Sequence, residues 1–274
     1  MIRSPSRRSW RRLEGITSAG IRQATPPAAA AGGRIFRLQI GMTTLFLALA
    51  VLAVVAASFS AALSLIALDV TRPQVSDVMD ELSKVTKFLL KFDVGGEQTV
   101  AAWLSSMLML LCAMVLFYIA TVKRHGSEPY AMHWLGLSVI FLALSMDEAV
   151  GFHEMTIMPL RETLQTGGVF LYAWVIPALL FVGALGIVYL GFLWHLEAAF
   201  RLRFVLAGAL FVGGAVGFEM LEGAFAAFYQ QHRLVHEAAV HLEDTLEFAG
   251  VLVFLHSLLL YARHQSDELR LRLI

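Results

Sequence analysis

The sequence predicts an all-α integral membrane protein: a six-transmembrane-helix bundle, with an amphipathic helix on the outer surface between the first two spans. Two observations carry this prediction. Hydrophobic residues make up 58% of the chain and charged residues only 15%, whereas soluble domains average about 25% charged residues. Long uncharged runs also recur along the chain, and about 20 apolar residues are enough to cross a bilayer as a helix.

Three of the expected spans depend on acidic flanks. The predicted spans are about 40–68, 99–122, 131–156, 166–194, 204–227 and 239–262. The uncharged parts of the third, fifth and sixth (131–146, 204–218 and 248–262) are too short to cross a bilayer alone. Each reaches spanning length only if the neighbouring acidic segment is helical too. The acidic residues should therefore lie inside the membrane or at its edge.

The segments outside the spans complete the predicted organisation. Residues 1–38 carry eight arginines against one acidic residue, Glu14, and we expect a largely disordered, basic cytoplasmic tail. Residues 39–264 form the transmembrane domain, and residues 265–274 form a second cytoplasmic tail. Residues 74–92 place apolar side chains at helical spacing, which predicts the amphipathic surface helix. Pro177 is expected to kink the fourth span.

The distribution of basic residues predicts the orientation. Lys and Arg cluster in the N-terminal tail, at Lys123 and Arg124, at Arg201 and Arg203, and near the C-terminus. Positive residues favour the cytoplasmic side. We therefore expect a multi-pass protein of the bacterial inner (cytoplasmic) membrane with both termini in the cytoplasm. The GxxxG pair Gly213 and Gly217 predicts close packing between helices of the bundle.

Eight carboxylates occur where membrane helices usually have none: Asp147, Glu148, Glu154, Glu219, Glu222, Glu243, Asp244 and Glu247. Each ionised side chain at bilayer depth costs roughly 2.5–3.5 kcal/mol, so something must offset their charge. A helix rises about 1.5 Å per residue. That rise brings all of them except Glu154 to one level in the outer part of the bilayer, with His153, Glu154 and His241 roughly 5–8 Å above it.

Helical spacing indicates which of these side chains share a face. Glu219 and Glu222 are three residues apart, and Glu243 and Glu247 are four apart, so each pair lies on one side of its helix. Glu148 and His153 cannot both point inward from an ideal helix. A distortion or helix end at Gly151, between them, would allow it.

Three explanations remain open for the acidic layer: a metal site, proton or cation handling, and a structural or assembly role. Carboxylates with a few imidazoles suit iron, manganese or zinc, and several carboxylates in a helix bundle suit two metal ions. We expect a divalent metal (Fe, Mn or Zn) in a mononuclear or dinuclear site. Its expected ligands are Glu148, His153, Glu219, Glu222, His241, Glu243 and Glu247. Asp147 and Asp244 are the expected catalytic residues, acting as a general base or by orienting a ligand.

The favoured function is a membrane-embedded metalloenzyme, either a hydrolase or an oxidoreductase. Its site in the outer half of the bilayer predicts a lipid-like or periplasmic substrate, with membrane lipid as its surroundings and no nucleic acid partner. The alternatives are a proton- or cation-coupled transporter and an accessory subunit of a larger membrane complex.

Three acidic segments also carry a family resemblance. LSMDEAVGFHE, GFEMLEG and EDTLEFAG occur in this order, and this arrangement resembles a family of uncharacterised bacterial polytopic membrane proteins. The resemblance covers roughly residues 90–262. It implies that the three acidic segments belong to one unit of a multi-pass protein, and it implies no particular reaction.

Overall fold

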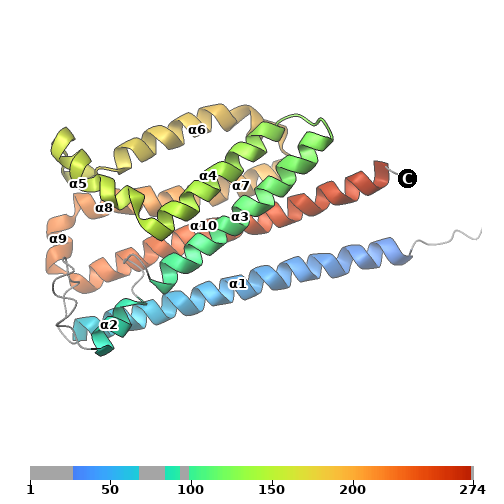
Figure 1. Cartoon of the computed structure of the whole chain (residues 1–274). Helices are drawn as coiled ribbons and strands as arrows, with labels where there is room; N and C mark the ends of the chain where they lie inside the picture. The colour runs from blue at the N-terminus through green and yellow to red at the C-terminus, as the bar shows by residue number, and fades with distance from the viewer. Residues whose placement is uncertain (1–26, 68–83, 93–98, 273–274) are drawn as a thin grey trace, which may run out of the picture. The chain divides into compact units, whose positions relative to one another are not determined.

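The computed structural model describes residues 27–67, 84–92 and 99–272, and these residues form helices and no strands (Figure 1). The chain divides into two units at Gln39 and Ile40. The site lies in the second unit, Ile40–Ile274, which is the part whose packing is described below.

Within the described residues, six helical stretches are long and apolar enough to cross a membrane. They are Gln39–Ala67, Val100–His125, Ala131–Val150, Val175–His195, Ala198–Ala224 and Arg233–Gln265. The helices concerned are α1 (Pro27–Ala67), α3 (Val100–His125), α4 (Ala131–Val150), α6 (Val175–His195), α7 (Ala198–Val212) and α10 (Arg233–Arg272). The fifth stretch continues from α7 through a π-helical segment, η4 (Gly213–Phe218), into α8 (Glu219–Ala224). The all-helical fold and the six apolar helices agree with the sequence prediction.

Short elements connect the long helices. They are α2 (Lys84–Leu90), α5 (Phe152–Leu164), the 3₁₀ turn η3 (Gly168–Phe170) and α9 (Ala226–Gln231). Helix α2 is the end of the predicted amphipathic helix, and the rest of that prediction, residues 74–83, lies outside the described residues.

Several boundaries differ from those predicted. Helix α4 ends at Val150, before the predicted end at 156, and α6 begins at Val175 instead of 166. Pro177 therefore lies in the first turn of α6, where its missing N–H breaks no helical hydrogen bond. The expected kink in the middle of the fourth span was wrong for this reason.

The two predicted tails also contain helix. Helix α1 begins at Pro27, so the end of the segment predicted as a disordered tail is helical, while residues 1–26 lie outside the described part of the chain. Helix α10 continues to Arg272, through most of the predicted C-terminal tail.

Helix α10 lies at the centre of the bundle and packs against both α7 and α3, while α3 packs along α4 (Figure 1). Ser106 and Ser145 join α3 to α4, because each hydroxyl donates to the other residue's carbonyl oxygen, at 2.7 and 2.9 Å. Side-chain hydrogen bonds join α1 to α10, from Ser58 to His241 at 3.0 Å and from Thr44 to His256 at 2.9 Å.

Glycines allow two close helix contacts around α10. A Cβ at Gly250 would lie 2.7 Å from the backbone nitrogen of Phe211, and a Cβ at Gly214 would lie 2.9 Å from the carbonyl oxygen of Glu243. A Cβ added at Gly213 or at Gly217 would meet no atom within 4 Å. The predicted role of that GxxxG pair in helix packing was therefore wrong. The close helix contact is made at Gly214, the residue after Gly213.

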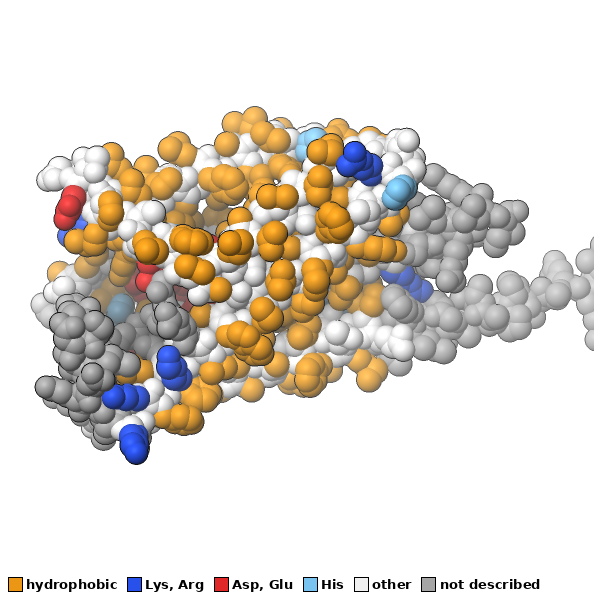
Figure 2. Space-filling model, viewed as in Figure 1, with side chains coloured by type: hydrophobic (Ala, Val, Ile, Leu, Met, Phe, Trp, Pro, Cys, Tyr) orange, Lys and Arg blue, Asp and Glu red, His pale blue; other side chains and the backbone are white. Residues whose placement is uncertain are grey.

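Hydrophobic side chains cover most of the surface seen in Figure 2. Acidic side chains show between them toward the end of the molecule that carries α5 (Figures 1 and 2). This pattern fits helices that face lipid along their length and gather acidic groups at one end.

Candidate functional site

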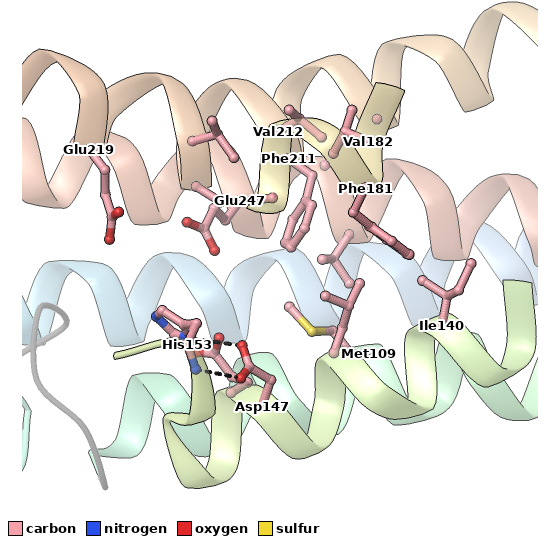
Figure 3. A pocket seen from close by; sticks show the side chains of 18 of the residues that line it. Met109, Ile140, Asp147, His153, Phe181, Val182, Phe211, Val212, Glu219 and Glu247 are labelled. Carbon is pink, nitrogen blue, oxygen red and sulfur yellow. Dashed lines mark hydrogen bonds and ion pairs between the residues drawn. The ribbon is translucent and has the colours of Figure 1, made fainter. Parts of the chain in front are cut away.

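A cavity of about 1160 Å³ runs between α4, α6, α7 and α10. Its two ends differ in chemistry. One end, called the polar end below, is lined by Asp147, Glu148, His153, Glu154, Tyr172, Trp174, Glu219, Glu222, His236, Glu243, Asp244 and Glu247. The remainder, called the apolar section, is lined mainly by Leu, Ile, Val, Phe and Ala side chains. Figure 3 shows Glu219, Glu247, Asp147 and His153 on one side of the view and Ile140 and Phe181 on the other.

The polar end begins at the break between α4 and α5. Gly151 has a φ of 71°, in the left-handed region that glycine adopts readily, and it ends α4. The chain then reverses, so that His153 returns to Asp147. The backbone N–H of His153 donates to one carboxylate oxygen of Asp147 at 2.9 Å, and its imidazole Nδ1 lies 2.7 Å from the other (Figure 3). Glu148 and His153 can both face the site only if a helix ends between them. Helix α4 does end there, at Gly151, as expected.

This pair also determines the protonation of His153, which lies outside the six apolar stretches. Burial alone would lower the pKa of the His153 imidazole, but the hydrogen bond and charge of Asp147 outweigh it and raise that pKa above its ordinary value. An imidazole fixed by a carboxylate in this way can take up and release a proton at a defined atom.

Glu219 and Glu222 enter the site from α8, directly after the π-helical segment. The indole N–H of Trp174 donates to Glu219, and the hydroxyl of Tyr172 donates to Oε2 of Glu222 at 3.3 Å. Burial and the charges of Glu222 and Glu219 raise the pKa of the Tyr172 hydroxyl, which therefore remains a proton donor. π-Helical segments often occur at functional sites.

Glu222 is the most enclosed of these carboxylates, with 7% of its surface exposed. Its Oε1 is buried and makes no hydrogen bond in the structure, and Nε2 of His236 lies 3.7 Å from it. A buried carboxylate oxygen without a hydrogen bond is costly unless something else binds it.

Helix α10 contributes Glu243, Asp244 and Glu247. All three line the cavity together with Glu148 on α4 and with Glu219 and Glu222 on α8.

His241 lies apart from this group. It is buried, and its ring nitrogens lie 3.0 Å from the Ser58 hydroxyl and 2.7 Å from the carbonyl oxygen of Glu237. Its ring packs edge-on against Phe59. His241 is not among the cavity-lining residues, because its side chain is turned toward α1. The prediction that His241 lies at the site, just above the acidic layer, was wrong for that reason.

Sequence reasoning missed three polar-end residues: Tyr172, Trp174 and His236. The predicted span 166–194 placed Tyr172 and Trp174 in a helix, whereas in the structure they lie in the connection before α6, so helical spacing could not indicate their direction. His236 has metal-like spacing with His232, but His232 is exposed and stacks on Phe228 instead.

The side chains of the polar end do not form a ready-made coordination shell. In the part of the chain that the structure describes, no group of three or more His, Cys, Asp or Glu residues is arranged to hold a metal ion. The expected ligands Glu148, His153, Glu219, Glu222, Glu243 and Glu247 share the cavity wall, as do Asp147 and Asp244.

Comparison with known proteins shows the family to which the chain belongs, but it gives no activity for that family. No curated protein and no solved structure gives a significant match to the chain. A family model, described as a domain of unknown function (DUF8692), matches residues 44–262, which include every residue that lines the cavity. The chain therefore belongs to the DUF8692 family.

Proposed function

We propose that this protein is a membrane-embedded, metal-dependent enzyme that acts on the polar head of a lipid-like molecule. One observation carries the proposal: eight carboxylates converge on one end of a cavity whose remaining length is apolar. A cavity with this division suits an amphiphile, with its chain in the apolar section and its head among the acids.

The charge balance of the polar end supports a bound cation. No Lys or Arg is among the described residues that line the cavity, and His153 and His236 are the basic groups there. Glu219, Glu222, Glu243 and Glu247 are the residues that would hold a divalent metal, with Glu148 and His153 at its side. Their long side chains can reach a common ion by changes of rotamer. The buried, unbonded Oε1 of Glu222 supports this assignment. A metal so held would supply Lewis acidity or an activated water.

The remaining polar groups have roles that need no metal. The Asp147–His153 pair would accept a proton from water or from a substrate hydroxyl, because Asp147 fixes the imidazole and favours its charged form. Trp174 and Tyr172 would hold Glu219 and Glu222 in position through their hydrogen bonds. Asp244 lines the same wall and would orient a neighbouring ligand.

The apolar section favours this proposal over proton or cation transport. A transport path needs polar groups through the membrane, whereas the acids stop at one level. His256, which lies further along α10, hydrogen-bonds Thr44 and does not line the cavity. We further propose that the protein resides in the bacterial inner membrane with both termini in the cytoplasm, which places the polar end in the outer half of the bilayer.

Metal analysis of the full-length protein, purified in detergent without chelator, tests the proposal. We expect stoichiometric Fe, Mn or Zn in the wild type and its loss in Glu222→Gln/Glu247→Gln. Glu162→Gln is the matched control, because Glu162 is an exposed acid on α5 that does not line the cavity. Wild-type protein that is free of metal, or a double variant that keeps it, would overturn the metal-dependent assignment.

A further inference from the structure

The apolar section of the cavity has a defined composition. Its walls include Ile140, Phe141 and Leu144 on α4 and Phe181, Val182 and Leu185 on α6. Among the described residues that line it, Tyr189 and Thr156 carry polar side-chain groups, and the Thr156 hydroxyl, on α5 beside the polar end, donates to the carbonyl oxygen of His153. Along most of its length the section therefore has no side chain that could hydrogen-bond or neutralise a polar or charged molecule. Its walls suit a hydrocarbon chain.

Tyr189 lies toward the end of this section away from the acids, where Phe192 and Leu193, on the next turn of α6, also line the cavity. Its hydroxyl donates to the carbonyl oxygen of His133 at 2.9 Å. Its ring packs edge-on against His133 and Phe192, with ring centres 5.2 and 5.7 Å apart. Gly136 leaves room for this contact, because a Cβ there would overlap the tyrosine hydroxyl. Tyr189 thus ties α6 to α4 at one point and, with Phe192 packed against it, forms the floor.

The depth of the section matches one lipid tail. Both Asp147, at the polar end, and Leu137, near the floor, line the cavity from α4. A separation of ten helical residues corresponds to about 15 Å. The hydrocarbon core of a bilayer is about 30 Å thick, so one leaflet accounts for about 15 Å. A single chain with its head at the acids would therefore reach Tyr189.

The side of the section offers a way in from the membrane. The close packing of α6 is mainly against η4, near the polar end, and Tyr189 joins it to α4 at the other end. Between these two points α4 and α6 both present apolar side chains to the cavity. A chain already in the bilayer could enter there without crossing water.

We infer that the apolar section binds one hydrocarbon chain of the lipid-like substrate, and that Tyr189 sets the longest chain it accepts. The inference rests on the proposed function in one respect only, namely that the cavity takes an amphiphile. Its floor and depth do not depend on whether the polar end holds a metal.

The test uses the full-length protein in nanodiscs that contain an equimolar series of straight-chain primary alcohols, from octanol to eicosanol. Alcohols have an uncharged head, so retention does not depend on the acids. After re-isolation, mass spectrometry measures the retained alcohols relative to nanodiscs without protein. We expect enrichment to peak at one chain length and to be lost for chains that are longer than the section accepts.

Variants locate the floor. Tyr189→Ala should move the peak to longer chains, and Tyr189→Phe should leave it in place, because the ring remains. Ile187→Ala is the matched control, since Ile187 lies on the same helix with 79% of its surface exposed. Leu185→Phe fills the section from its wall and should move the peak to shorter chains, which keeps the test decisive if Tyr189→Ala does not fold.

The outcomes separate the two proposals. Enrichment with no preferred length, or with a peak that neither Tyr189→Ala nor Leu185→Phe moves, would overturn the role of Tyr189 while leaving amphiphile binding intact. No enrichment of any alcohol over empty nanodiscs would instead overturn the amphiphile-binding part of the proposed function.

Discussion

The contact between α10 and α7 allows a quantitative prediction for Gly250→Ala. The added Cβ would lie 2.7 Å from the backbone nitrogen of Phe211, 2.8 Å from the carbonyl oxygen of Ala207 and 2.9 Å from Cβ of Phe211, where ordinary contacts are 3.4–4 Å. Two of these atoms belong to the backbone and cannot rotate aside, so the helices must separate by several tenths of an ångström.

The expected net effect is a destabilisation of about 2 kcal/mol. Overpacking costs about 1–3 kcal/mol, and backbone contacts favour the upper part of that range. Replacing glycine by alanine inside a helix returns about 0.5–1 kcal/mol. At roughly 2–4 °C per kcal/mol for a chain of this size, the melting temperature in detergent should fall by about 4–8 °C.

Gly208→Ala on α7 is the matched control. A Cβ at Gly208 has no atom within 4 Å, so this variant keeps only the gain in helix propensity and should melt slightly above the wild type. Thermal unfolding of both variants, followed by circular dichroism in the same detergent, measures the difference. Equal melting temperatures for Gly250→Ala and Gly208→Ala would refute the packing argument.

Three further predictions concern α4 and its end. In Asp147→Asn the pKa of His153, measured by NMR titration, should fall below that of the wild type, because burial of the imidazole remains while the opposing charge is gone. In the wild type, the stability that this raised pKa contributes is complete below the ordinary value of 6.5 and is lost as the pH rises through the folded-state pKa; an Asp147→Asn variant with the wild-type stability profile across that window would contradict the pairing. Gly151→Ala places a side chain at a φ of 71°, which should cost about 1–2 kcal/mol and lower the melting temperature, and an unchanged value would mean that the turn can relax. Ser145→Ala removes one of the two reciprocal hydrogen bonds with Ser106, so we expect a loss of about 1 kcal/mol in thermal unfolding, and a variant as stable as the wild type would show that the bond contributes nothing.

That acids from three helices line one cavity could be predicted because helical rise is nearly constant. Counting residues placed Glu148, Glu219 and Glu247 at one level, and all three line one cavity. The break at Gly151 could be predicted as well, since no unbroken helix can point both Glu148 and His153 inward.

The rotation of each helix could not be predicted in the same way, because tertiary contacts set it. His241 was expected to be a metal ligand just above the acidic layer, yet its ring bonds the Ser58 hydroxyl on α1 and does not line the cavity. Nothing in the spacing of α10 residues carries information about α1. Trp174 and Tyr172 were missed for a different reason: the sequence predicted a helix over 166–194, whereas both residues lie in an irregular connection before α6.

The π-helical segment Gly213–Phe218 has a consequence for insertions and deletions. A π-helical turn accommodates one residue more than an α-helical turn, so deleting one residue from this segment would restore a regular helix. Because only this extra residue is lost, every later residue of the helix would keep its direction. Glu219 and Glu222 would therefore stay on the cavity wall. The segment thus holds one residue that the chain can lose without turning these two carboxylates away from the site.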